Sequence, residues 1–212
     1  MYNSNIHHRR SIRLKGYDYS QEGLYFITLC TTDRVHLFGE IENGEMQLNT
    51  YGEIAKQEWL KTIEIRKNIE LLEYIIMPNH IHGIIEIKYS LSNENKKELG
   101  KFKSPSQTIG AIIRGYKGAT TKRIKEIIKK DNISTGELQF APTAPTAPTA
   151  PPNPTAPNTQ LLSRIDLSKS IWQRNYYENI IRDEKALNNI SNYIFNNPKK
   201  WEEDKFYKSI SN

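Results

Sequence analysis

The stretch Met77-Pro78-Asn79-His80-Ile81-His82-Gly83-Ile84-Ile85 determines how this chain of 212 residues is interpreted. Side chains alternate between the two faces of a strand, so His80 and His82 point to one side while Ile81 turns to the other. Two imidazoles that converge in this way can chelate one metal ion. Their neighbours are strongly apolar, which favours a metal site on a half-buried strand over two ordinary surface histidines.

Around this stretch the apolar residues form segments of strand length. We expect a strand over 24–32 (LYFITLCTT), which is rich in β-branched and aromatic residues. A hairpin or short strand is expected within 35–48, where Asn43-Gly44 supplies the turn. Two further apolar segments cover 69–77 and 81–87. The sheet that these strands form is expected to be mostly antiparallel.

Three other segments have helical periodicity. The first is expected to begin at Thr50, which forms a capping box with Glu53. The second covers 106–130, and the third covers 183–197 and ends before Pro198. The expected buried stripes are Ile54, Ala55, Trp59 and Ile63 in the first helix, Ile109, Ile112, Ile113, Tyr116, Ile124, Ile127 and Ile128 in the second, and Leu187, Ile190 and Ile194 in the third. This mixture of strands and helices predicts an α/β (α+β) fold.

Composition and charge narrow the class of protein. A hydrophobic fraction of 37% without any long apolar run excludes a membrane-spanning chain. The first residues lack the features of a secretory signal and Cys30 is the only cysteine, so we expect a cytoplasmic protein without a disulfide or a cysteine-based zinc site. The net charge of +6 is unevenly distributed, because residues 1–15 carry +4 and residues 101–130 carry +8. Such basic segments are typical of a protein that binds a polyanion, although a solvated helix face and a basic tail would give the same pattern.

The segment 141–158 contains seven of the ten prolines, no charge and a repeated Thr-Ala-Pro unit. Proline excludes helix and central strand, so we expect a disordered or polyproline-II-like spacer. The segments before and after the spacer can be interpreted as parts of one fold without it, and we therefore expect one domain formed by 1–140 and 159–212. A proline-rich ligand for an adaptor domain is the alternative.

The positions of other residues exclude several metal enzymes. No histidine follows His82, whereas amidohydrolases and metallo-β-lactamases need further downstream histidines. The JAMM deubiquitinase pattern is met by Ser90 but fails at Asn93, which stands in place of the metal-binding aspartate. The C-terminal helix offers Tyr193 and Asn197, which share a helical face because they are four residues apart.

Two imidazoles and one amide oxygen would leave coordination positions open for phosphate oxygens, which suits Mg²⁺ or Mn²⁺. Such a metal would polarise a phosphodiester, and Tyr193 would attack the phosphorus. A tyrosine that only packs against its neighbours is the competing interpretation.

With these two histidines and this tyrosine, the chain resembles the REP-associated tyrosine transposases, which belong to the HUH single-strand nucleases. The segments that carry the resemblance are RRSIRL (9–14), YDY (17–19), GLYFITLCT (23–31), MPNHIHGII (77–85), IGAIIRGYKGATTKRI (109–124) and IWQRNYYENIIRDEKALNNISNYIFNNPKKW (171–201). In this family the two motif histidines match His80 and His82, and the nucleophile matches Tyr193. The polar residue that completes metal binding matches Asn197.

The resemblance implies a ferredoxin-like or RRM-like antiparallel sheet flanked by helices. It also implies cleavage and rejoining of single-stranded DNA at hairpin-forming palindromic repeats, with a covalent 5′-phosphotyrosine intermediate and a free 3′-hydroxyl. The cofactor would be Mg²⁺ or Mn²⁺, and the protein would act as a monomer or a homodimer. The alternatives are a non-catalytic hairpin DNA-binding protein derived from such a transposase and, more distantly, an RNA-binding domain.

Basic residues are the candidates for contact with DNA phosphates. They comprise Arg9, Arg10 and Arg13 on the N-terminal arm, Arg114, Lys117, Lys122 and Arg123 on the long helix, and Arg174 in the Trp-Gln-Arg segment.

Four positions near the Trp-Gln-Arg segment leave alternatives open. Trp172 is expected either to pack in the core or to stack on unpaired bases. Tyr176 and Tyr177 are rival nucleophiles, but only Tyr193 has an amide one turn further on. Asn179 stands where family members often have a histidine, so no role is assigned to it.

Overall fold

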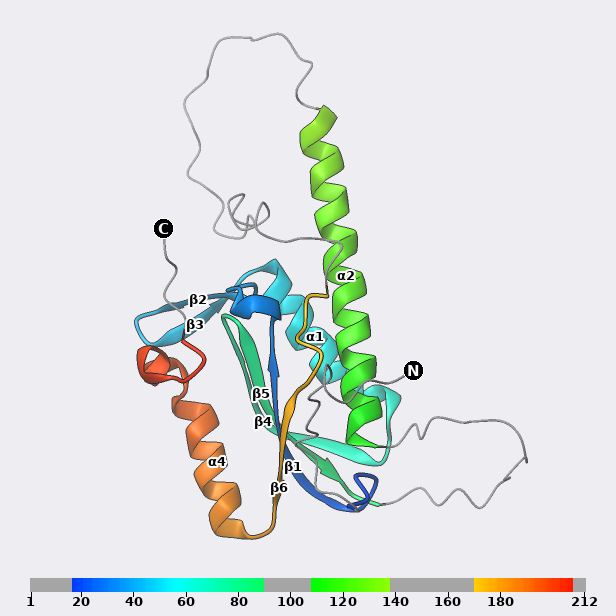
Figure 1. Ribbon diagram of the computed structural model, residues 1–212, viewed down its shortest axis with the longest axis vertical. Coiled ribbons are helices and arrows are strands. Elements are labelled where there is room, and N and C mark those ends of the chain that lie inside the picture. Colours follow the sequence, from blue (N-terminus) through cyan, green and yellow to red (C-terminus); the bar gives the residue numbers. More distant parts are fainter. Residues whose placement is uncertain (1–16, 90–107, 138–169, 208–212) are drawn as a thin grey trace, which may run out of the picture.

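The computed structural model describes residues 17–89, 108–137 and 170–207. The elements form one main sheet with helices packed on both of its faces (Figure 1). In chain order they are β1 (Gly23–Cys30), the 3₁₀ turn η1 (Thr32–Arg34), β2 (Gly39–Glu42), β3 (Glu45–Leu48), α1 (Thr50–Ile65), β4 (Ile69–Met77), β5 (His80–Ile87), α2 (Ile109–Glu137), β6 (Tyr177–Ile181), α4 (Glu184–Asn196) and η3 (Pro198–Glu203).

The main sheet has the strand order β4-β5-β1-β6, and every pairing in it is antiparallel. Helix α1 connects β1 to β4 and α2 connects β5 to β6, which gives the βαββαβ connectivity of ferredoxin-like folds. The short strands β2 and β3 form a separate hairpin. The expected class, an antiparallel sheet flanked by helices, is confirmed.

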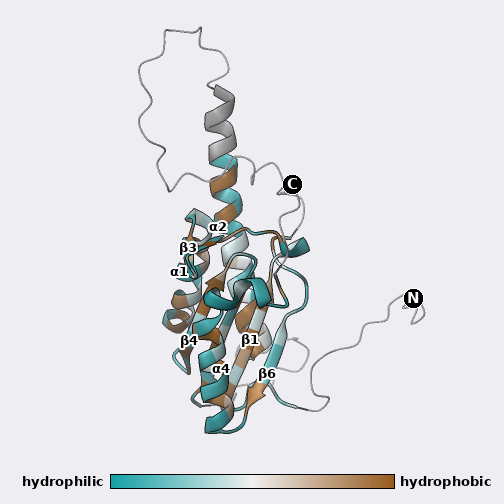
Figure 2. Ribbon diagram, turned by 90° about the vertical axis from the view of Figure 1, so that its left-hand side faces the viewer, coloured by the Kyte–Doolittle hydropathy of each residue, from teal (hydrophilic) through white to brown (hydrophobic). Residues whose placement is uncertain are grey.

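The sheet is covered on both faces, and the alternation along β1 assigns each side chain to one of them. Tyr25, Ile27 and Leu29 pack with α1 and α2 in the larger of two apolar clusters. Phe26 lies in the smaller cluster with Ile194 of α4. Figure 2 views the sheet from the side of α4, whose ribbon carries both hydrophilic and hydrophobic residues. Two helices therefore cover one face of the sheet, and α4 covers part of the other.

Local sequence signals explain the hairpin and the start of α1, with one correction. Asn43 and Gly44 both adopt positive φ angles, 52° and 76°, as a tight hairpin turn requires. Helix α1 is capped by Asn49 rather than by Thr50, because the Asn49 carboxamide oxygen accepts hydrogen bonds from the backbone of Tyr51 and Gly52. The predicted cap is therefore wrong by one residue, and no capping box forms with Asn49, because the residue three positions later is Gly52.

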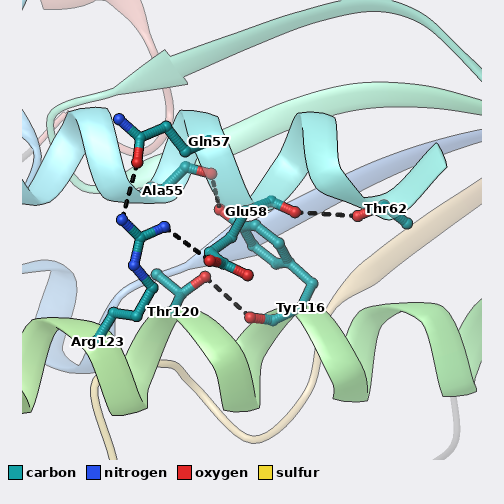
Figure 3. Close-up of polar contacts among 7 residues, drawn as sticks. All are labelled: Ala55, Gln57, Glu58, Thr62, Tyr116, Thr120 and Arg123. Atoms are coloured by element: carbon teal, nitrogen blue, oxygen red, sulfur yellow. Dashed lines mark hydrogen bonds and ion pairs between the residues drawn. The ribbon is translucent and has the colours of Figure 1, made fainter. Parts of the chain in front are cut away.

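Helices α1 and α2 are joined by polar contacts as well as by apolar packing (Figure 3). Arg123 donates to Glu58 at 2.7 Å and to Gln57 at 2.8 Å, and the buried Tyr116 hydroxyl donates to the Ala55 carbonyl at 3.1 Å. The predicted stripe of α2 is buried as expected, with Ile127 half-buried. In α1 the prediction fails at Ile63, which is 44% exposed because it lies beyond the edge of the face that α2 and the sheet cover.

The C-terminal half contains one predicted helix and one strand that the sequence did not reveal. Helix α4 follows the expected range and is capped by Asp183, whose carboxylate accepts from the Ala186 backbone at 2.7 Å. Strand β6 pairs with β1 and completes the sheet at its edge. No helix within the described ranges is long and apolar enough to cross a membrane. The spacer at 141–158 and the arm with Arg9, Arg10 and Arg13 lie outside the described residues.

Two glycines provide a matched test of packing on this scaffold. A Cβ at Gly83 would lie 2.4 Å from the Trp59 ring, whereas a Cβ at Gly118 of α2 would meet nothing within 4 Å. Gly83→Ala is expected to lower the free energy of unfolding by about 1 to 3 kcal/mol through overpacking. Gly118→Ala is expected to raise it by about 0.5 to 1 kcal/mol, because glycine is a poor helix former. Urea denaturation of both variants measures the two effects, and equal effects would contradict the packing of Trp59 on β5.

Candidate active site

The two motif histidines lie on β5, on the face that α4 covers. His80 is opposite Cys30 and His82 is opposite Thr28 on β1, and both imidazoles are almost completely buried. Their ring centroids are 4.4 Å apart. The predicted arrangement on one strand face is therefore present, with Ile81 on the other side in the larger apolar cluster.

A buried asparagine fixes the tautomer of His80. The Asn79 amide nitrogen donates to the carbonyls of Phe206 at 2.9 Å and Arg34 at 3.3 Å, which orients its oxygen Oδ1 towards His80 Nδ1, 2.9 Å away. Because Oδ1 can only accept, Nδ1 carries the proton and the lone pair of the neutral ring is on Nε2. This buried Nε2 has no hydrogen-bond partner among the described residues.

Both rings are held in the neutral form. Burial first, and then the positive charges of Arg34 and Lys205, lower the pKa of His80 to about 3. Burial and the neighbouring His80 lower the pKa of His82 well below its ordinary value. His82 Nδ1 lies 2.8 Å from the Thr28 hydroxyl. Neutral imidazoles fixed by such contacts are the form that binds metal ions.

Helix α4 brings Tyr193 to the histidines, and Asn197 follows one turn later. The Tyr193 hydroxyl lies 3.1 Å from His82 Nε2 and donates to Asp204 Oδ2 at 3.0 Å. The Asn197 amide nitrogen donates to the same Asp204 oxygen at 2.8 Å. Burial and the Asp204 carboxylate raise the pKa of Tyr193, so the phenol is protonated in this arrangement.

The donor set fits a divalent metal ion. His80, His82 and Asp204 each offer a ligand atom, and these atoms lie within 4.8 Å of one another. Asn197 Oδ1 is buried and, like His80 Nε2, lacks a hydrogen-bond partner within the described ranges. Buried polar atoms without partners are uncommon in proteins, and a bound ion would satisfy both. The group can therefore hold a metal, and its anionic member was not found from the sequence.

The other aromatic candidates occupy different surroundings. Trp172 is 2% exposed and packs against Phe38 and Tyr116, so it is a core residue rather than a surface for stacking bases. Tyr177 is 47% exposed on β6, and its ring faces Phe26 with a centroid distance of 6.3 Å. Among these tyrosines, only Tyr193 has a described hydrogen-bond contact with a motif histidine.

The basic residues predicted to contact DNA fall into two groups. Arg114, Lys122 and Arg174 are exposed, so their side chains are accessible to a ligand. Arg123 instead joins the two helices, and the Lys117 ammonium donates to the carbonyls of Gln173 and Asn175. Burial lowers the pKa of Lys117 to about 8. DNA contact by all of these residues stays a prediction.

Three functional candidates were missed by sequence reasoning, namely Asp204, Arg34 and Lys205. All of them reach the histidines through tertiary contacts, and Phe206 links them. The Phe206 ring lies over His80 with centroids 4.7 Å apart, and the Arg34 guanidinium lies 5.1 Å from the centre of the same ring. The local sequence offered only one signal, a carboxylate seven residues after Asn197.

No protein-family model matches the chain. A protein of Haemophilus influenzae, described only as uncharacterized, is 39% identical over 212 residues, covering 97% of this chain and 97% of that protein. The chain belongs to the same family as this protein.

Two solved structures are similar to the chain. One is a REP-associated tyrosine transposase bound to a REP hairpin, with 16% identity, a TM-score of 0.49, and coverage of 92% of this chain and 77% of that chain. The other is a Deinococcus radiodurans protein assigned as a transposase, with 15% identity, a TM-score of 0.38, and coverage of 88% and 97%. The first belongs to the family that the sequence motifs resemble. With TM-scores below 0.5, neither likeness bears on function, which depends on the residues of the site.

The neutral state of the histidines predicts a pH dependence of stability. Both pKa values are depressed in the folded protein, so the unfolded chain binds more protons below its ordinary histidine pKa of about 6.5. In the presence of a chelator, the urea midpoint is expected to fall as the pH decreases from about 7 towards 3. His80→Gln, which cannot titrate, is expected to show a shallower decrease. The same slope in both proteins would contradict the assignment of a depressed pKa to His80.

Proposed function

We propose that this protein is a metal-dependent single-tyrosine transposase or endonuclease that cleaves and rejoins single-stranded DNA at hairpin-forming repeats. The single observation that carries the proposal is the contact of the Tyr193 hydroxyl with His82, beside a second histidine whose Nε2 is buried and unpartnered. A phenol adjacent to a candidate metal site is the arrangement that nucleophilic attack on a phosphodiester requires. The sequence motifs supply the comparison with REP-associated tyrosine transposases.

His80, His82 and an oxygen of Asp204 or Asn197 would hold the ion, for which we propose Mg²⁺ or Mn²⁺. When bound, the ion would polarise the scissile phosphodiester and neutralise part of its charge. Asn79 and Thr28 keep the two rings oriented.

Tyr193 is the proposed nucleophile. Its oxygen would form a bond to phosphorus while the bond from phosphorus to the 3′ oxygen breaks, which leaves a 5′-phosphotyrosine and a free 3′-hydroxyl. Asp204 Oδ2 accepts the phenolic hydrogen bond at 3.0 Å and is placed to take the proton as the new bond forms. The proton would then pass to the departing 3′ oxygen. Reversal of these steps with another 3′-hydroxyl rejoins DNA, so no external energy source is needed.

The first test uses tyrosine variants and labelled single-stranded DNA that contains palindromic repeats from the protein's own genome, with Mn²⁺ or Mg²⁺. Tyr193→Phe is expected to abolish strand cleavage on a denaturing gel and to leave hairpin binding nearly intact. Tyr177→Phe is the matched control, because this exposed tyrosine lies on the same sheet face, and it is expected to retain cleavage. Full cleavage by Tyr193→Phe would disprove the nucleophile, and binding without cleavage by the wild type would favour a non-catalytic hairpin-binding protein.

A second test separates the two roles available to Asp204. Asp204→Asn is expected to lower the cleavage rate by about 100-fold or more, the usual size of a general-base contribution. If the carboxylate is also a metal ligand, the variant will bind Mn²⁺ more weakly in calorimetry, by about 10- to 100-fold. Unchanged metal affinity with lost cleavage would assign Asp204 to proton transfer alone. Unchanged cleavage would remove it from the site.

A further inference from the structure

A groove of about 900 Å³ lies at the carboxyl end of β1, outside the histidine site. One wall consists of Thr32, Asp33 and Arg34 in η1, and the other consists of Ser170, Trp172, Gln173 and Arg174. The two walls are fastened together, because the Thr32 hydroxyl donates to the Ser170 carbonyl at 2.7 Å and Thr31 pairs with Trp172 in an isolated bridge. The groove is therefore part of the rigid sheet edge.

Two arginines give the groove its charge. Arg34 lines one wall, next to the acidic Asp33, and Arg174, which is exposed, lines the other. Planar guanidinium groups match the oxygens of a phosphate with two parallel hydrogen bonds. Two arginines that line the same groove suit the binding of a phosphodiester there.

Arg34 is held in place before any ligand binds. Asp33 and Arg34 both have φ angles of 54°, in the left-handed region that residues other than glycine seldom adopt. The Arg34 side chain donates through Nη1 to the Lys205 carbonyl at 2.8 Å, and its guanidinium packs on the Phe206 ring. These contacts hold the backbone and the side chain in place, and neither of them uses the N–H groups of Nη2 and Nε.

Arg34 connects the groove to the candidate active site through one aromatic side chain. The Phe206 ring that supports Arg34 also packs on His80, and the Arg34 charge acts on the His80 ring. The ammonium of Lys205 lies 4.9 Å from the centre of the Phe206 ring, on the same connecting segment. The Phe206 ring therefore lies against both Arg34 of the groove and His80 of the candidate active site.

We propose that this groove binds the phosphodiester backbone of the unpaired DNA flank next to the cleaved bond, with Arg34 and Arg174 as its phosphate contacts. This subsite rests on the proposed function, because it presumes that single-stranded DNA leads to Tyr193. In this proposal the groove positions the strand that is cut, and the hairpin stem binds to other residues.

The test measures binding by fluorescence anisotropy in a Tyr193→Phe background, which prevents cleavage. Two labelled DNA probes share one palindromic hairpin, and only one of them carries an unpaired flank. Arg34→Ala and Arg174→Ala are each expected to weaken binding of the flanked probe by about tenfold, the effect of losing one charged hydrogen-bonded contact. Binding of the blunt probe is expected to stay unchanged. Arg34→Lys keeps the positive charge but lacks the paired N–H donors of the guanidinium, so it is expected to lose part of the affinity for the flanked probe.

Lys61→Ala is the matched control for loss of one positive charge, because Lys61 is exposed on α1, on the opposite side of the sheet. It is expected to bind both probes as the parent does. Equal losses on both probes, or no loss on the flanked probe, would overturn the subsite. An RNA flank or inorganic phosphate that competes as well as the DNA flank would overturn its assignment to DNA. If the groove variants lose flank binding but the wild-type protein forms no DNA adduct, the subsite stands and the catalytic proposal fails.

Discussion

The orientation of His80 by the buried carboxamide of Asn79 is the interaction on which the site depends. The carboxamide is itself fixed by two backbone carbonyls, one from η1 and one from the C-terminal segment. It therefore determines which ring nitrogen is protonated and leaves the other one free in a nearly dry environment. An isolated strand could not do this, because the ring would rotate and exchange its proton with water.

The fold brings three distant parts of the chain to these rings. Strand β1 contributes Thr28, helix α4 contributes Tyr193, and the turn after η3 contributes Asp204. The ferredoxin-like connectivity makes this possible because α1 and α2 cover one sheet face, which leaves the other face to α4 and the site (Figure 1). The alternation of side chains along β5 therefore places apolar packing on one face of the sheet and the candidate active site on the other.

The sequence predicted those parts that depend on local periodicity. The strands other than β6, and the placement of Tyr193 and Asn197 on one helical face, follow from alternation and helical spacing. The long helix was also predicted, but it begins at Ile109 and ends at Glu137 instead of covering 106–130. Strand β6 was missed because Tyr177–Ile181 contains Glu178 and Asn179 and lies at a sheet edge, where polar residues are tolerated. Asp204 and Arg34 were missed because their proximity to His80 arises only from tertiary packing. For the same reason, no local pattern revealed that Arg123 is paired with Glu58.

The central claim is that the histidine pair and Tyr193 act together on a DNA phosphodiester. The most direct measurement is peptide mass spectrometry of the product formed with Mn²⁺ and single-stranded repeat DNA. The account predicts one tryptic peptide carrying a nucleotide through Tyr193, and no such product after chelation of the metal. A nucleotide attached to Tyr177, or cleavage that leaves no protein adduct and a hydrolysed 5′-phosphate, would contradict it.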